Sequence, residues 1–290
     1  MAPILRNFHD VSSCRLRFAI GCNEQRVFIT CPSVSTGGLS VPNFSARNRT
    51  MCTVTFIPRP NGYSLAMNRD EKRTRLEALP PVRRNKDGRT VVYPSEPSGG
   101  TWIALNDSGA CLALINWYSV TARVESGVIS RGQLVSSVTA ASARERVDVG
   151  LTDLPLDRIN PFRLIGVFRA SREVVEWRWD LKELVGRQHR WRAQQWISSG
   201  FDEPAAQQIR GKTFRLSQDK KSSENLQWLR RLHRSHLPEP GPFSTCMHRA
   251  DASTMSYTEI TVSQRQATMR YCPGPPCQAV HAPTVSVLTL

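Results

Sequence analysis

Cys52 is the residue with the clearest chemical potential, because it follows a methionine at the start of MCTVTFIPRPNGYSLAMNRDE, residues 51–71. Methionine is readily removed when the next residue is small, so processing at Met51 would place a free α-amine beside the Cys52 thiol. An α-amine has a pKa of about 8, so part of it is unprotonated at neutral pH and accepts the thiol proton. One residue would then supply both nucleophile and base, as in the N-terminal variants of the catalytic triad.

Three further side chains complete this chemistry. Arg69 and Asp70 end the next expected strand, and a hairpin would bring them back beside Cys52. There Arg69 would lower the thiol pKa and Asp70 would orient the amine. Asn116 ends the apolar stretch ACLALIN, and its side-chain amide is a donor for a developing oxyanion. We therefore expect these residues to form one site.

The same residues also have ordinary structural interpretations, which spacing alone leaves open. Cys52 is compatible with an inert strand residue. Residues 68–71 are compatible with a solvated strand exit that holds a local ion pair. Asn116 is compatible with a cap or turn at a strand end.

The elements that would position these residues are antiparallel strands with helices between them. Residues 52–57 and 63–68 flank the turn sequence PRPNG and predict a hairpin, and residues 99–118 predict a second one. Further strands are expected at 161–168, 173–180, 256–263 and 267–273, helices at 130–147, 202–210 and 223–232, and a polar Pro-rich excursion through residue 98. Sequential hairpins with grouped helices indicate an α+β layered domain rather than a parallel doubly wound sheet.

Charge and hydropathy restrict the partners. The chain has 39 Lys and Arg against 24 Asp and Glu, a net charge of +15, which favours anionic partners. Its basic residues are scattered rather than gathered in an aromatic-interleaved block, so no specific nucleic-acid binding is expected. No run approaches ~20 apolar residues, so no transmembrane segment is expected. A small-molecule or acyl ligand suits the charge, and the oligomeric state is open.

The cysteines and histidines predict neither disulfides nor a metal. Five of the eight cysteines lie after residue 50 and have no paired CxxC spacing, and Cys272 and Cys277 are separated by Pro-Gly-Pro-Pro. His233 and His236 lie three apart without a third ligand at a suitable spacing, so a solvated helical face is expected. Free thiols in a reducing compartment are the simpler interpretation. No metal and no cofactor is expected.

We divide the chain into three segments. Residues 1–50 are a disordered leader or an overextended start, 51–275 form the domain, and 276–290 are a C-terminal tail. The leader lacks a secretory pattern, which favours a cytoplasmic protein. Its arginines and serines keep a mitochondrial location as the alternative, if this segment is a genuine transit peptide.

The motifs of residues 51–71 resemble the opening of the NRDE family, to which Transport and Golgi organisation protein 2-like proteins belong. That family is named for an Asn-Arg-Asp-Glu tetrad, here Asn68 to Glu71, and its members begin at a Met-Cys dipeptide. The similarity continues through GGTWIALNDSGACLALIN, SRGQLV and NPFRLI, and more loosely through CMHRADASTMSYTEI. It covers most of residues 51–272 and none of the leader.

The resemblance implies a fold and a set of roles. The family is similar to N-terminal-nucleophile hydrolases, whose four αββα layers place two antiparallel sheets between helices. Its opening also resembles penicillin V acylase and bile salt hydrolase, in which a cysteine attacks an amide. By that similarity Cys52, Arg69, Asp70 and Asn116 take the catalytic roles. Asn68, Glu71, Trp102 and Trp117 are the expected ligand-binding residues.

The chain also departs from the family pattern. Ser253-Thr254-Met255-Ser256 lacks the arginine of a TRSST-like segment, and WISSGFDEP replaces a GLSNAL-like stretch that would supply a second amide donor. Two hypotheses follow. The first is a cysteine N-terminal-nucleophile hydrolase of amide bonds, and the second is a protein that binds a lipid, acyl-CoA or haem-like ligand without turnover.

Overall fold

The computed structural model describes residues 18–21, 24–27, 50–218, 225–278 and 282–290. Its strands are β1 (Phe18–Gly21), β2 (Glu24–Val27), β3 (Met51–Arg59), β4 (Gly62–Lys72), β5 (Leu79–Lys86), β6 (Arg89–Ser95), β7 (Ile103–Asn106), β8 (Ala110–Asn116), β9 (Phe162–Phe168), β10 (Glu173–Trp179), β11 (Leu184–His189), β12 (Gln194–Ser199), β13 (Ala252–Val262), β14 (Gln266–Pro273) and β15 (Thr284–Thr289). The helices are α1 (Arg131–Val138), α2 (Arg144–Thr152), α3 (Glu203–Gln218) and α4 (Leu226–His233), with a 3₁₀ turn at Leu156–Arg158.

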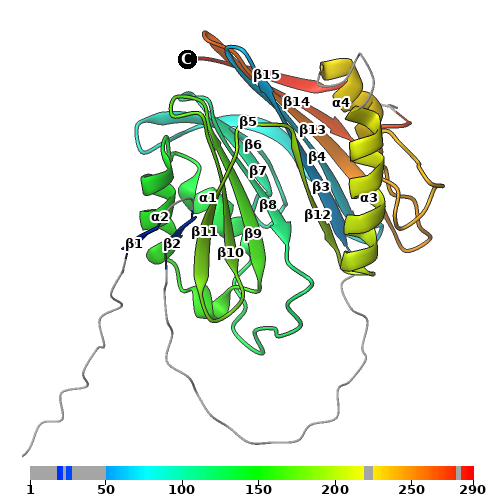
Figure 1. Cartoon of the computed structure of the whole chain (residues 1–290), viewed down its shortest axis with the longest axis horizontal. Coiled ribbons are helices and arrows are strands. Elements are labelled where there is room, and N and C mark those ends of the chain that lie inside the picture. Colours follow the sequence, from blue (N-terminus) through cyan, green and yellow to red (C-terminus); the bar gives the residue numbers. More distant parts are fainter. Residues whose placement is uncertain (1–17, 22–23, 28–49, 219–224, 279–281) are drawn as a thin grey trace, which may run out of the picture.

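Two large antiparallel sheets face each other (Figure 1). One has seven strands in the order β11-β10-β9-β8-β7-β6-β5, and the other has six in the order β12-β3-β4-β13-β14-β15. Most neighbours are also consecutive in the chain. The exceptions are in the six-stranded sheet, where β12 returns to pair with β3 and β13 returns to pair with β4. These two returns place later segments on both sides of the β3–β4 hairpin.

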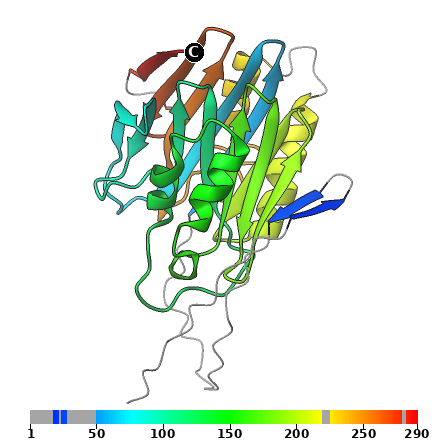
Figure 2. The ribbon, with the colours of Figure 1, turned by 90° about the vertical axis from the view of Figure 1, so that its left-hand side faces the viewer.

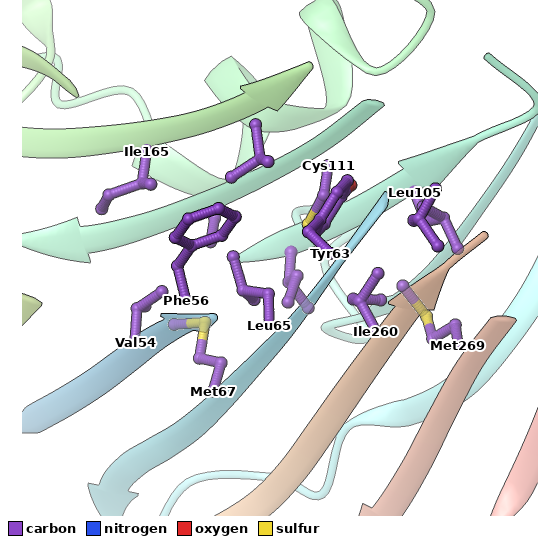
Figure 3. Close-up of a cluster of buried hydrophobic side chains, with 14 of the residues drawn as sticks. Val54, Phe56, Tyr63, Leu65, Met67, Leu105, Cys111, Ile165, Ile260 and Met269 are labelled. Carbon is purple, nitrogen blue, oxygen red and sulfur yellow. The ribbon is translucent and has the colours of Figure 1, made fainter. Parts of the chain in front are cut away.

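Helices cover the outer face of each sheet, so the domain has four layers. Helices α1 and α2 lie across the seven-stranded sheet, as the view in Figure 2 shows, and α3 and α4 lie against the six-stranded one (Figure 1). Between the sheets packs a cluster that includes Phe56, Leu65 and Ile165 (Figure 3). Separate buried clusters fill the two helix–sheet layers. The predicted αββα sandwich of antiparallel sheets is therefore confirmed.

Two expectations about local structure are wrong. The helix expected over 130–147 is two helices, because Asn106 Nδ2 donates to the carbonyls of Thr139 and Ala141, at 3.0 and 2.9 Å. These bonds fix the connection between α1 and α2 in a non-helical path. The polar Pro-rich excursion also contains two strands, β5 and β6, which pair with each other and extend the seven-stranded sheet. Strand β5 lies at the edge of the sheet and has one buried residue, so its sequence lacks the apolar alternation of a strand.

The two ends of the chain contribute short strands. Strand β15 lies within residues 276–290, the expected C-terminal tail. It pairs with β14 over Thr284 to Thr289. Strands β1 and β2 pair with each other. The rest of residues 1–49, on which the leader prediction falls, lies outside the described residues. Over the described ranges, no helix is both long and apolar enough to cross a membrane.

Candidate functional site

A cavity of about 270 Å³ opens at one end of the space between the sheets, where β3, β4 and β8 meet. Cys52, Arg69 and Asn116 line it from those three strands, although they are far apart in the sequence. The complete lining is Thr50, Cys52, Arg69, Asp70, Glu71, Arg75, Glu96, Thr101, Trp102, Leu114, Asn116, Val128, Ile129, Ser130, Arg131, Gly132 and Asn160. The structure thus gathers the four residues proposed for catalysis around one cavity.

Cys52 is held between two neighbouring strands. It pairs with Arg69 of β4 on one side and with Ser198 of β12 on the other. The hairpin expected from the sequence therefore places Arg69 directly opposite Cys52. Met51 continues the same strand and is fully buried, beneath Ile197 and Met247. The peptide bond before Cys52 is thus part of the sheet.

The thiol of Cys52 is not activated in this chain. Burial and, after it, the charge of Asp70 raise its pKa to about 12. The backbone of Asp70 and the charge of Arg69 act in the lowering direction but are outweighed. Arg69 thus acts in the expected direction, but in the intact chain desolvation of the thiolate is the larger influence on the pKa of Cys52.

Arg69 is engaged by acidic and aromatic neighbours. Its Nη2 donates to Glu96 at 2.8 Å and lies 3.5 Å from Glu71, and its guanidinium stacks 4.3 Å from the ring centre of Trp102. Arg75 reaches the same two carboxylates at 3.2 and 2.6 Å. This network fixes the guanidinium beside the cavity, and it leaves Arg69 less positive charge to offer the thiol.

Asp70 directs its carboxylate toward helix α3. It accepts from Thr254 Oγ1 at 2.6 Å and lies 3.3 Å from Nη2 of Arg210, with both members of the ion pair fully buried. Burial raises the pKa of Asp70 to about 6, while Arg210 and Thr254 act in the lowering direction. Asp70 therefore connects the site to α3 and β13.

Asn116 has its amide occupied in the intact chain. Its Nδ2 donates to the hydroxyl of Tyr118 at 2.7 Å and to Oγ1 of Thr50 at 3.3 Å, and these two hydroxyls are also hydrogen-bonded to each other. Thr50 precedes the Met-Cys dipeptide. Thr50, two positions before Cys52, therefore shares with Tyr118 the amide that was proposed to bind an oxyanion.

The expected ligand-binding residues fall into two groups. Glu71 and Trp102 line the cavity. Asn68 instead lies on the helix side of the sheet, where its amide donates to the carbonyls of His233 and Thr245, at 2.9 and 2.8 Å. Trp117 lines separate hollows together with Arg178. The structure therefore brings together six of the eight proposed residues.

Several groups in or beside the cavity were not singled out from the sequence. Glu96 follows β6, Tyr118 follows β8, Arg131 is the first residue of α1, and Arg210 lies inside an expected helix. Arg210 is fully buried and donates to Thr53 Oγ1 at 2.6 Å as well as pairing with Asp70. The sequence signal that could have identified Arg210 is a charged residue on the helix face expected to be buried. Because buried arginines need a partner, such a position predicts an ion pair.

His233 is buried rather than solvated, which corrects the expectation for this helix. Its ring nitrogens lie 3.0 Å from Asn68 Oδ1 and 2.9 Å from Thr55 Oγ1. Burial and, after it, the charge of Arg210 lower its pKa from 6.5 to about 3. As the pH falls through 6.5, His233 therefore binds a proton in the unfolded chain but stays neutral in the folded chain. The stability supplied by neutral His233 is present above this pH and lost as pH falls.

The replacement His233→Gln should reduce stability at neutral pH by a margin that shrinks in acid. One pKa unit corresponds to 1.36 kcal/mol, so the difference from the parent chain should narrow by about 2 kcal/mol between about pH 6.5 and 5. Urea unfolding of both chains at several pH values measures this. A difference that stays constant with pH would contradict a neutral buried His233.

Known proteins resemble this chain in sequence motifs and in structure. Residues 51–184 match the model of the family Transport and Golgi organisation 2, which confirms the resemblance noted in the motifs. No curated protein matches the chain. Solved structures similar to it include penicillin V acylase from Agrobacterium tumefaciens, with 12% identity, coverage of 82% of this chain and 86% of that one, and a TM-score of 0.46. A mutant conjugated bile acid hydrolase from Clostridium perfringens has 8% identity, coverage of 83% and 92%, and a TM-score of 0.46.

Proposed function

We propose that the cavity is the site of a cysteine amide hydrolase that becomes competent when Cys52 is the first residue of the chain. The observation that carries this proposal is the convergence of Cys52, Arg69 and Asn116 on one cavity from three different strands. A thiol, a cation and an amide donor are the groups that acyl transfer through a thioester uses.

The proposed reaction needs only these groups and water. The free α-amine of Cys52 takes the thiol proton, and the thiolate attacks the amide carbonyl. The oxyanion that forms accepts a hydrogen bond from Asn116, and its collapse breaks the C–N bond while the α-ammonium protonates the leaving amine. Water then hydrolyses the thioester, with the α-amine again acting as base. Arg69 stabilises the thiolate, and Asp70 holds its strand in place through Arg210.

Removal of the upstream residues would change the site in two favourable ways. Loss of Thr50 would leave Asn116 Nδ2 available to an oxyanion, since Thr50 is one of its two acceptors. Loss of Met51 would open the buried end of β3 to water, which lowers the cost of charging the thiol. The substrate would then occupy the space that Thr50 fills at the cavity.

The test is a chain prepared with Cys52 as its first residue, incubated with a panel of acyl amides of varied chain length. We expect amine release and a transient acyl adduct on Cys52, seen in the intact mass. Cys52→Ala should abolish both, and Asn116→Ala should lower kcat by about 10²–10³. The full chain is the matched control and should be inactive. A chain that begins at Cys52 and forms neither adduct nor product would contradict the proposal.

A second function, binding of an anionic acyl ligand without turnover, is favoured by Arg131. This residue lines the cavity, and burial lowers its pKa. Its Nη1 donates to the carbonyl of Pro161 at 3.1 Å, and no carboxylate among the described residues forms an ion pair with it. A carboxylate or phosphate would satisfy this cation. Ligand retention by Cys52→Ala, together with its loss in Arg131→Met, would establish this alternative.

We infer a reducing, cytoplasmic environment for either function. Cys52, Cys111, Cys246, Cys272 and Cys277 are all free thiols. Attack by Cys52 on an amide requires a reduced thiol. Free thiols are typical of cytosolic proteins, which rarely carry stable disulfides.

A further inference from the structure

Four potential metal ligands, none of which lines the cavity, meet near the start of β13. His236 follows α4, Cys246 and His248 lie in the segment that leads into β13, and Cys277 follows β14. The ligand atoms of all four residues lie within 4.8 Å of one another. Three separate segments of the chain therefore bring two thiols and two imidazoles to one point.

The distances fit a single small ion. His248 Nε2 lies 3.6 Å from Cys246 Sγ and 3.2 Å from Cys277 Sγ. A tetrahedral zinc ion with bonds of about 2.3 Å to sulfur and 2.05 Å to nitrogen separates such ligand atoms by about 3.6 Å. The two sulfur–nitrogen distances are thus close to the ligand–ligand separation in a tetrahedral zinc site.

Two features of the surroundings point to a ligand rather than to packing. The Nε2 atom of His236 is buried and has no hydrogen-bond partner among the described residues, although its ring lies 5.0 Å from that of His248. A buried polar atom without a partner is costly unless something satisfies it. The backbone around Cys246 is also fixed, because its N–H donates to the carbonyl of Ser235 and its carbonyl accepts from Ser244 Oγ.

We propose that His236, Cys246, His248 and Cys277 form a structural Zn²⁺ site of the Cys₂His₂ type. On binding, the two thiols release their protons to solvent, and two thiolates with two neutral imidazoles balance the charge of the ion. Soft thiolates and imidazoles favour zinc over magnesium or calcium. Four protein ligands close a tetrahedron, so the site has no open position for a substrate and its role is structural.

The site would join the C-terminal segment to the layer behind Cys52. Cys277 belongs to the part of the chain that leads to β15. Met247, between Cys246 and His248, packs in one buried cluster with Met51. The N–H of Met247 also donates to Thr254 Oγ1, whose hydroxyl donates to Asp70. Bound zinc would therefore hold the start of β3 and the carboxylate of Asp70 in place.

Sequence spacing concealed this cluster. Cys246 and His248 are separated by one residue, and Cys277 lies 29 positions beyond His248. Neither interval belongs to the common zinc motifs. The expectation that the chain holds no metal therefore rested on spacing, whereas the fold decides which residues meet.

The first test is the metal content of the full chain, purified and kept under reducing conditions and then titrated with Zn²⁺. We expect about one tightly held zinc per chain, falling to below about a tenth in Cys277→Ser and in His248→Gln. Cys272→Ser is the matched control, because Cys272 lies five residues before Cys277 and outside the cluster. Its zinc content should stay at about one.

A second measurement uses the unaltered chain, so it remains informative if the variants fail to fold. Co²⁺ in place of zinc should produce the intense visible bands of a tetrahedral thiolate complex. Zinc should also protect Cys246 and Cys277 from alkylation, but not Cys272. The proposal is overturned if the reduced chain takes up no more zinc than Cys277→Ser. It is likewise overturned if a Cys246–Cys277 disulfide forms and the chain, once reduced again, stays metal-free.

Discussion

A chain that begins at Cys52 should be alkylated at this residue roughly 100-fold faster than the full chain at neutral pH. In the intact chain, burial and the charge of Asp70 raise the pKa of Cys52 to about 12. Exposure of the strand end, together with a neighbouring α-amine, should return the thiol to a pKa of about 8.5. The reactive thiolate then becomes more than about 10³-fold more abundant.

The expected rate gain is smaller than the gain in thiolate, because a thiolate of lower pKa is a weaker nucleophile. With a Brønsted coefficient of about 0.4–0.5, a fall of about 3.5 pKa units removes nearly half of the gain on a logarithmic scale. About two powers of ten remain. Limiting iodoacetamide, quenched at intervals and mapped to peptides, measures the rate at Cys52 separately from the other cysteines.

The same experiment contains its own control. Cys272 is partly exposed and lies far from the start of β3 in the sequence, so its alkylation rate should be the same in both chains. Equal rates at Cys52 in the two chains would mean that the upstream segment does not suppress the thiol. The hydrolase proposal would then lose its account of activation.

The replacement Arg210→Met should destabilise the protein by about 3–5 kcal/mol, the range measured when one member of a buried ion pair is removed. Arg210 is fully buried and connects α3 to Thr53 of β3 and to Asp70 of β4. Its loss would leave the carboxylate of Asp70 buried with Thr254 as its remaining donor among the contacts described above. Methionine has a similar length and no charge, so the effect would report the ion pair more than the packing.

Two matched variants make this result specific. Arg215→Met changes the same residue type on the exposed side of the same helix and should alter stability by less than about 0.5 kcal/mol. The double replacement Arg210→Met with Asp70→Asn should cost less than the sum of the two single changes, because neither charge is then left unpaired. Urea unfolding of the parent chain and these four variants measures the differences. A loss below about 1 kcal/mol in Arg210→Met would show that the buried pair is dispensable.

The sequence predicted the central part of the fold because local patterns specify hairpins. Alternation on both sides of PRPNG predicted the pairing of Cys52 with the end of the next strand, and the structure places Arg69 opposite it. The apolar stretch before Asn116 predicted a buried strand, which is now β8 between two neighbours. These features depend on side chains only a few residues apart.

Other features depended on contacts between distant segments and escaped prediction. Strand β5 has one buried residue, and β12 shows no apolar–polar alternation, so their pairing with β6 and β3 defines them. The break between α1 and α2 follows from the side chain of Asn106 on another strand. Local propensity carries no information about such partners.

The sequence by itself determined the family region, the antiparallel layered architecture and the presence of a thiol, a cation and an amide suited to acyl transfer. The tertiary structure alone decided the electrostatic state of that thiol, because a pKa depends on burial and on charges brought from other strands. It also decided that Asp70 faces Arg210, that Thr50 contacts Asn116, and that two cysteines and two histidines from distant segments meet. Burial and proximity are properties of the packed chain, so residue types and spacing could not supply them.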